Sequence, residues 1–197
     1  MDVVAYLATA MGIAWASGIN LYATVAVLGV LGATGHMELP AELTVLTNEA
    51  VIGVAIFMYL VEFFADKIPG VDLGWDTIHT FIRIPAGAIL AANQVGELSQ
   101  EIQIIAFLLG GMVAASSHTV KMTGRIVVNT SPEPFSNWLT SIGEDLAALG
   151  ALWLAFSHPY VMLGILVTFF VFAMWITPKL FSTIKLVLNK LSKMFSN

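Results

Sequence analysis

The chain of 197 residues contains no cysteine and few charged residues. Without cysteine it has neither disulfides nor thiolate metal ligands. Only 11% of its residues are Asp, Glu, Lys or Arg, whereas soluble domains carry about 25%. Hydrophobic residues make up 58%, more than a soluble core of this size can bury. The composition therefore predicts an integral membrane protein, whose apolar surface is solvated by lipid.

The first apolar stretch has no basic residue before it. Asp2 is its only early charge, and the stretch continues past Leu31. A secretory signal peptide begins with a positive region and ends at a small-residue cleavage site. We therefore expect a retained membrane segment.

Six apolar stretches predict an all-α membrane protein with about six transmembrane helices, because one crossing needs about 20 apolar residues. The first stretch is too long for one straight span, and Ser17, Gly18 and Asn20 interrupt it, so we expect a broken helix. The third is short and is expected to begin earlier, within 72–83. The stretches are residues 3–34, 50–64, 84–95, 102–120, 139–156 and 160–176.

The basic residues predict the orientation, since Lys and Arg accumulate on the cytoplasmic side. The tail 179–197 contains lysines and no acid, so we expect it to be cytoplasmic. With six crossings every Lys and Arg falls on that side, and both termini are cytoplasmic in a bacterial inner membrane. Apolar residues recur at helical spacing in the tail, which predicts an amphipathic helix bound to membrane lipids.

An internal repeat is suggested by a shift of 99 positions, which aligns Gly12 with Gly111 and Ser17 with Ser116. Each half then holds three predicted spans, and an odd number gives the halves opposite orientations, as in many secondary transporters. We predict a single transmembrane domain, 1–197, with a 3+3 inverted repeat. Its parts are the first repeat 1–97, the second repeat 98–178 and the cytoplasmic tail 179–197.

Polar and charged residues inside the apolar stretches are the candidate functional residues, because ionisable groups in a membrane are costly and mark functional sites. Charged residues between Asp72 and Arg83 recur at helical spacing and so form a stripe on one helix face. Lys121 and Arg125 lie on one face of a second predicted helix. The structural alternatives are small-residue helix packing, cations that snorkel to headgroups, an in-plane helix with a wet face, and a cap formed by Ser141 and Glu144.

Two sets of residues follow from these patterns. The predicted solute- or ion-binding residues are Ser17, Asn20, Glu62, Asp66, Ser116, Ser117, His118, Glu144 and Asp145. The predicted charge-network or headgroup-binding residues are Lys67, Asp72, Asp76, His79, Arg83, Lys121, Arg125, Glu133 and Asn137.

Three segments, EFFADKIPGVD, SSHTVKMTGR and SPEPFSN, together resemble a bacterial family of small integral membrane proteins catalogued as a domain of unknown function. The resemblance covers nearly the whole chain and implies a membrane location, without an activity. The 3+3 layout is also similar to that of small cation exchangers, but their Glu-x-Gly-Asp-Lys-Thr signature is absent.

The leading functional hypothesis is a transporter or channel for a small solute, coupled to an ion or to a proton through His118. The second is a lipid-binding or lipid-translocating protein that grips a phosphate headgroup with Arg83, Lys121 and Arg125. The third is a non-transporting scaffold that orients helices and binds a partner, such as another copy of the chain. Catalytic and phosphate-loop motifs are lacking, so we expect no enzyme, no cofactor and no nucleic-acid partner, and leave a metal open.

Overall fold

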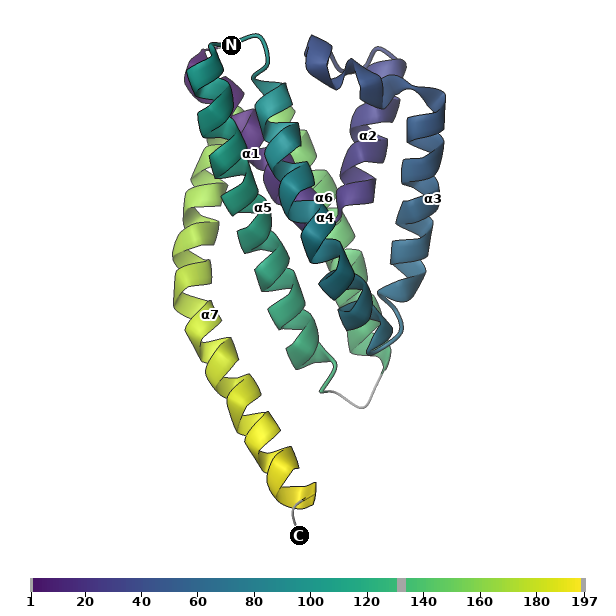
Figure 1. Ribbon diagram of the computed structural model, residues 1–197, viewed down its shortest axis with the longest axis vertical. Coiled ribbons are helices and arrows are strands. Elements are labelled where there is room, and N and C mark those ends of the chain that lie inside the picture. Colours follow the sequence, from purple (N-terminus) through teal and green to yellow (C-terminus); the bar gives the residue numbers. More distant parts are fainter. Residues whose placement is uncertain (1, 131–133, 196–197) are drawn as a thin grey trace.

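A computed structural model describes residues 2–130 and 134–195, without the side chains of residues 134, 177, 180, 181 and 183–195. The described residues form helices joined by short turns and loops and include no strand. Its helices lie roughly along one axis as an elongated bundle (Figure 1). The elements are α1 (Val3–Ile19), α2 (Leu21–Ala33), the 3-10 helix η1 (Ala41–Thr47), α3 (Glu49–Ala65), α4 (Val71–Gln94), α5 (Gln100–Val128), α6 (Pro134–Ser157) and α7 (Pro159–Phe195).

Three helices in the described residues are long and apolar enough to cross a membrane: Gln100–Val128, Phe135–Ser157 and Pro159–Ile176. A fourth span results if η1 and α3, which meet at 68°, are counted as one. The helices α1 and α2 are apolar but shorter. The protein is therefore all-helical with three or four candidate membrane spans, and the predicted number of six goes beyond this count.

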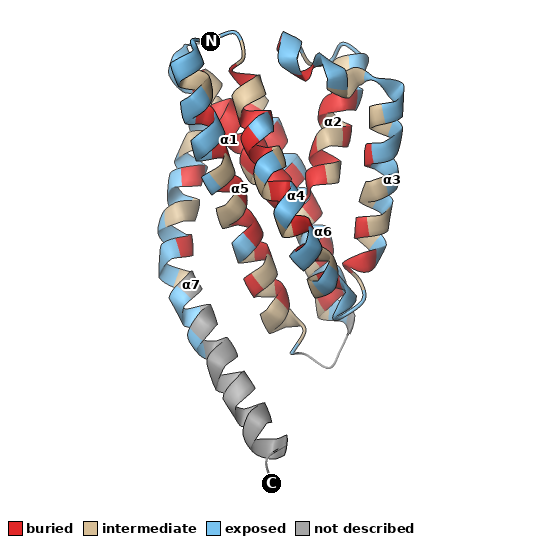
Figure 2. Ribbon diagram, in the orientation of Figure 1, coloured by how far each residue is buried: buried red, intermediate tan, exposed pale blue. Residues whose placement is uncertain are grey.

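Buried positions lie on the helix faces that point to the interior of the bundle, and exposed positions lie on its outside (Figure 2). Many of the exposed positions hold large apolar residues. Phe57, Phe81 and Trp153 are 64%, 82% and 63% exposed. An exposed apolar surface of this extent is typical of helices that face lipid.

The predicted break in the first apolar stretch is confirmed, and it lies at Asn20. Its backbone is extended, with φ −145° and ψ 97°. The Asn20 N–H donates to the Ala16 carbonyl as the C-cap of α1. Its side-chain Oδ1 accepts from the Ala23 N–H as the N-cap of α2. One residue thus ends the first helix and starts the second.

The helices α1 and α2 form a hairpin that enters and leaves at the same end of the bundle (Figure 1). At the start of α1, Asp2 accepts a hydrogen bond from the Tyr160 hydroxyl at the start of α7. At the far end of α2, a Cβ on Gly32 would lie 2.9 Å from Thr47 of η1. The hairpin tip, by contrast, lies deep inside, where Lys121 Nζ donates to the Ile19 carbonyl.

In the structure, residues 3–34 therefore form a hairpin, whereas the sequence led us to expect one broken span. The N-terminus lies at the end of the bundle that holds the α4–α5 and α6–α7 turns, and α7 runs to the opposite end (Figure 1). The two termini thus lie at opposite ends of the bundle, whereas the sequence led us to expect both in the cytoplasm. Small and polar residues at a break allow a kink or a full reversal, so the sequence indicates the break without its direction.

The two predicted repeats have different backbones in the described structure. The break at Asn20 aligns with Thr119 under the shift of 99 positions, and Thr119 lies inside the unbroken α5. The inverted repeat stays a prediction from the sequence.

The polar segment 72–83 and the apolar segment after it form one helix, α4, as expected. It continues through Pro85 to Gln94. The predicted tail is also continuous with its neighbour, because α7 runs through Pro178 to Phe195. Most side chains of the tail and residues 196–197 lie outside the described part, so its contact with lipid stays a prediction.

Glycines let α1, α4 and α5 approach each other closely around the hairpin. A Cβ on Gly87 of α4 would lie 2.5 Å from the Ala114 Cβ and 2.9 Å from Ser17 Oγ. A Cβ on Gly18 would overlap the Ser117 side chain and the Ala114 carbonyl. Close packing of small residues is a main source of helix association in membranes.

Candidate functional site

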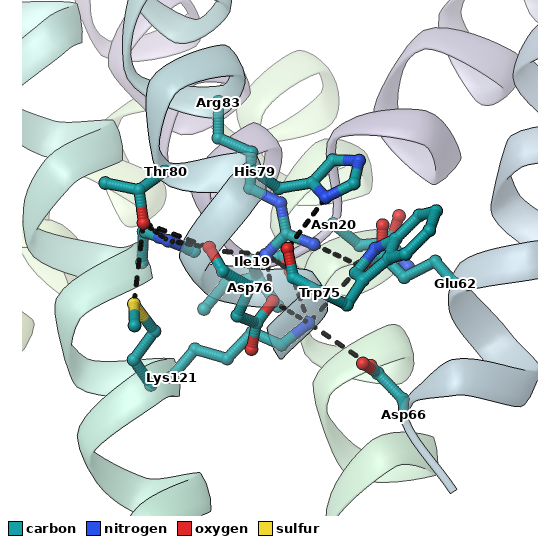
Figure 3. A network of polar contacts seen from close by, with 12 residues as sticks. Ile19, Asn20, Glu62, Asp66, Trp75, Asp76, His79, Thr80, Arg83 and Lys121 are labelled. Carbon is teal, nitrogen blue, oxygen red and sulfur yellow. Dashed lines mark hydrogen bonds and ion pairs between the residues drawn. The ribbon is translucent and has the colours of Figure 1, made fainter. Parts of the chain in front are cut away.

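The ionisable residues of four helices meet in the bundle interior beside the hairpin tip (Figure 3). Most of their side chains are fully buried, and Glu144 is the most exposed at 15%. Charged groups are stable in such an interior only when they are paired and hydrogen-bonded. We call the following set the charge network: Glu62, Asp66, Asp72, Asp76, Arg83, Lys121, Arg125 and Glu144.

Arg83 of α4 joins the charge network to α3 and to the hairpin. Its Nη2 lies 2.5 Å from Glu62 Oε1, and its Nη1 lies 3.0 Å from Asp76 Oδ1. The same Nη1 donates to the Ile19 carbonyl over 3.1 Å. Ile19 is the last residue of α1, where the helix dipole is negative and favours a cation.

Lys121 of α5 lies at the centre of the charge network. Its Nζ lies 3.2 Å from Glu62 Oε1, 3.2 Å from Asp66 Oδ2 and 3.4 Å from Asp76 Oδ1. It also donates to the Ile19 carbonyl over 3.2 Å. An ammonium has only three protons, so these oxygens share its charge.

Arg125, one turn after Lys121, connects the charge network to α6. Its Nη2 lies 2.5 Å from Glu144 Oε2 and 3.0 Å from Asp66 Oδ2. Its Nη1 donates to the Asp66 carbonyl and lies 3.9 Å from Asp72 Oδ2. Asp72 also accepts from Asn129 Nδ2.

The charge network contains more acids than bases. Five carboxylates face two guanidinium groups and one ammonium. Among the described residues, four buried carboxylate oxygens have no hydrogen-bond partner, namely Glu62 Oε2, Asp66 Oδ1 and both oxygens of Asp76. Of these, Asp76 Oδ1 lies within ion-pair distance of Arg83 and Lys121. Surplus negative charge in a buried site is relieved by a proton or a cation. No group of three or more His, Asp and Glu in the described part of the chain is placed to hold a metal ion.

Two histidines flank the charge network. His118 Nδ1 lies 3.3 Å from Arg83 Nη1, and its Nε2 lies 2.8 Å from Thr80 Oγ1. Since a guanidinium only donates, Nδ1 accepts and the ring proton is on Nε2. His79 is also buried, and its Nε2 contacts the Tyr22 hydroxyl at 3.0 Å.

Asp145 follows Glu144 but has different partners. Its Oδ1 accepts from Asn20 Nδ2 over 2.9 Å, and its Oδ2 accepts from the Tyr59 hydroxyl over 3.2 Å. The hairpin tip is thereby connected to α6.

Several predicted site residues lie apart from the charge network. Ser17 and Ser117 are buried, but each hydroxyl donates to a carbonyl of its own helix. Ser116 lines a cavity between α5 and α7. Lys67 lies 3.0 Å from the Phe63 ring centroid, and burial lowers its pKa below the usual value.

The last two predicted residues lie beyond α5. Asn137 supports Asn129, to which it donates over 2.8 Å. Glu133 lies outside the described residues.

Sequence reasoning missed four side chains and one carbonyl that contact these residues. Asn129 lies one helical turn after Arg125, and Thr80 lies next to His79, so helical spacing points to both. Tyr22, Tyr59 and the Ile19 carbonyl have no such signal, because their contacts depend on the fold of the hairpin.

The charge network lies in a region of the chain that matches a known protein family. No curated protein and no solved structure matches the chain. A family model described as "Domain of unknown function (DUF4126)" matches residues 7–179, which include the whole charge network. This agrees with the resemblance carried by the three sequence segments. The chain therefore belongs to the DUF4126 family, which is defined as a domain of unknown function.

Proposed function

We propose that this protein is a membrane transporter or channel for a small solute and that protons drive or accompany the movement. One observation carries the proposal: the hairpin tip ends at a buried charge network in which five carboxylates face three bases. Neither a packed core nor a lipid-facing surface requires such a cluster, because apolar residues would fill the same space at lower cost.

The geometry of the hairpin supports this function. Many transporters bind ions where a helix is interrupted within the membrane, because the freed carbonyls and helix ends provide ligands there. Here the Ile19 carbonyl accepts from Arg83 and Lys121 at the end of α1. A change in protonation of Glu62 or Asp76 would alter these bonds and so act on the hairpin tip.

A polar cavity at the opposite end of the hairpin offers an entrance. Its volume is about 580 Å³, and its lining includes Tyr6, Glu38, Gln94 and Glu97. Gln94 is 3% exposed, and its Oε1 has no hydrogen-bond partner among the described residues. An acidic cavity concentrates cations, including protons, at its mouth.

The proposed arrangement in the bacterial cytoplasmic membrane has five crossing helices, α3 to α7, and one re-entrant hairpin. The end that holds the N-terminus has Asp2, Glu38, Glu42, Glu97 and Glu101 but no Lys or Arg within residues 2–66 or 84–120. The lysines of the tail follow α7 at the other end. The positive-inside rule then places the C-terminus in the cytoplasm and the N-terminus outside.

The test uses purified protein reconstituted into liposomes that contain a pH-sensitive dye. A potassium gradient with valinomycin drives protons inward, and lithium, sodium, magnesium or hexylammonium chloride is then added outside. We expect faster acidification than in empty liposomes. On addition of at least one cation, we also expect a change in lumenal pH that differs from the change in empty liposomes.

Asp76→Asn removes one surplus acid of the charge network with little change of shape, and it should slow proton movement. The matched control Glu101→Gln removes an exposed acid at the other end of the bundle and should behave like the wild type. Size-exclusion profiles must show that each protein is folded. Folded protein that moves no protons under any of these conditions would overturn the proposal and favour a lipid-binding protein or a scaffold.

A further inference from the structure

A second site is indicated by a cavity between α2, α3 and α6. Its volume is about 450 Å³, which falls within the range of small-molecule sites, about 300–1,000 Å³. Eight of its ten lining residues are aliphatic, and the other two are Tyr59 and Asp145. Leu60 and Leu149 on its rim are 46% and 41% exposed, so the cavity opens on the lipid-facing surface of the bundle.

Among the described residues, Asp145 is the only charged group in the lining, and it has no basic partner there. Its two oxygens accept from the neutral groups Asn20 Nδ2 and Tyr59 OH. No Lys, Arg or His nitrogen of the described residues lies within 4.0 Å of its carboxylate. The adjacent Glu144, in contrast, lies 2.5 Å from Arg125. The negative charge of Asp145 is therefore available to a ligand in the cavity.

The walls determine which cation fits this charge. A divalent metal ion needs several oxygen or nitrogen ligands, and one carboxylate in an aliphatic cavity does not provide them. A small inorganic cation would also leave most of the lining without a partner. An organic ammonium ion fits both the carboxylate and the walls, since its charge pairs with Asp145 and its hydrocarbon body contacts the aliphatic side chains.

A neighbouring cavity provides an internal comparison. It lies between α2, α3 and α4, has a volume of about 530 Å³, and is lined by residues such as Leu21, Val25 and Ala50. None of the described residues in its lining is an acid. The two cavities thus present similar apolar walls, with and without a carboxylate.

We propose that the cavity at Asp145 binds a monovalent organic cation with a compact apolar body, such as a protonated alkylamine, that enters from the membrane. The assignment of this cation as the transported solute rests on the proposed function; its binding does not. The hydrogen bond from Asn20 to Asp145 connects the occupied cavity to the hairpin tip, and so to the charge network.

The test is isothermal titration calorimetry of the full chain in nanodiscs, with the heat from empty nanodiscs subtracted. The probes are hexylammonium, 1-hexanol and hexanoate, which share an alkyl chain and differ in charge. We expect saturable binding of hexylammonium, weaker binding of hexanol and none of hexanoate. Asp145→Asn should weaken hexylammonium binding roughly tenfold to a hundredfold, as expected for the loss of a charged hydrogen-bond acceptor.

A second pair of variants keeps the test decisive if Asp145→Asn does not fold. Ala26→Leu fills the cavity at Asp145 and should abolish binding, whereas Ala50→Leu adds the same bulk to the cavity without an acid and should not. Equal binding of hexylammonium and hexanol would show a nonspecific or lipid-filled cavity and overturn the proposal. Hexylammonium binding that is unchanged in the Ala26→Leu variant would also overturn the proposal. Protein that binds hexylammonium but moves no protons contradicts only the proposed function.

Discussion

Asn20 Nδ2 donates a hydrogen bond to Asp145 Oδ1 over 2.9 Å and joins the tip of the α1–α2 hairpin to α6. The two residues lie 125 positions apart in the sequence. The Oδ1 of the same Asn20 side chain accepts from the Ala23 N–H and starts α2. One buried side-chain amide therefore caps the second helix of the hairpin and binds the hairpin tip to α6.

Asn20→Ala should destabilise the protein more than the loss of an ordinary helix cap. Loss of the cap costs about 0.5–2 kcal/mol, and the buried Asp145 left with one donor fewer costs about 1–3 kcal/mol more. The control is Asn48→Ala, which removes the exposed N-cap of α3 and nothing else. Chemical unfolding in detergent, followed by circular dichroism, measures the loss of unfolding free energy for both variants. Equal losses for the two variants would contradict a structural role for the Asn20–Asp145 bond.

Arg83→Met should be among the most damaging single substitutions, because it leaves Glu62 and Asp76 buried with less positive charge. Removal of one partner from a buried ion pair costs about 3–5 kcal/mol. The double variant Arg83→Met with Glu62→Gln should recover part of the loss, because the unpaired charge is gone. A double-mutant cycle from unfolding curves gives the coupling energy. Additive losses would show that the two side chains do not interact as the 2.5 Å distance requires.

Gly18→Ala should displace the hairpin, since the new Cβ would overlap the Ala114 carbonyl, and backbone atoms cannot move aside cheaply. Gly53→Ala is the matched control, because nothing lies within 4 Å of its Cβ position. Gly53 lies inside α3, so alanine there should stabilise by up to about 1 kcal/mol through helix propensity. Thermal unfolding of the two variants should therefore shift in opposite directions, and a stabilised Gly18→Ala protein would contradict the close packing of α1 on α5.

The sequence predicts the buried charges of this protein better than its topology. The stripe from Asp72 to Arg83 repeats at helical spacing, and an ordered stripe of charge on an apolar helix needs a partner. The ion pairs between helices could not be predicted. The spacing of charged residues shows which helix face they share, but it does not show which helix that face contacts. Arg83 meets Glu62 and the Ile19 carbonyl only because the hairpin ends between α3, α4 and α5.

The direction of α2 could not be predicted from the sequence either. Asn20 signals an interruption, but a kinked span and a reversed hairpin need the same small and polar residues. The positive-inside rule could not decide either, since residues 2–34 contain no Lys or Arg to place. A single acid, Asp2, tells little, because acids contribute weakly to membrane orientation.

The hairpin makes a sharp prediction about sidedness, which the absence of cysteine makes simple to test. Asp2→Cys and Glu42→Cys should both react with a membrane-impermeant thiol reagent added to intact spheroplasts, because α1 and α2 return to the same side. Ile68→Cys, in the turn between α3 and α4, should react only after the membrane is permeabilised. If α1 and α2 formed one span, Asp2→Cys would instead be protected together with Ile68→Cys. All three positions are exposed on the protein, so only the bilayer can make their labelling differ. The labelling pattern therefore distinguishes a hairpin from a span without any assumption about transport.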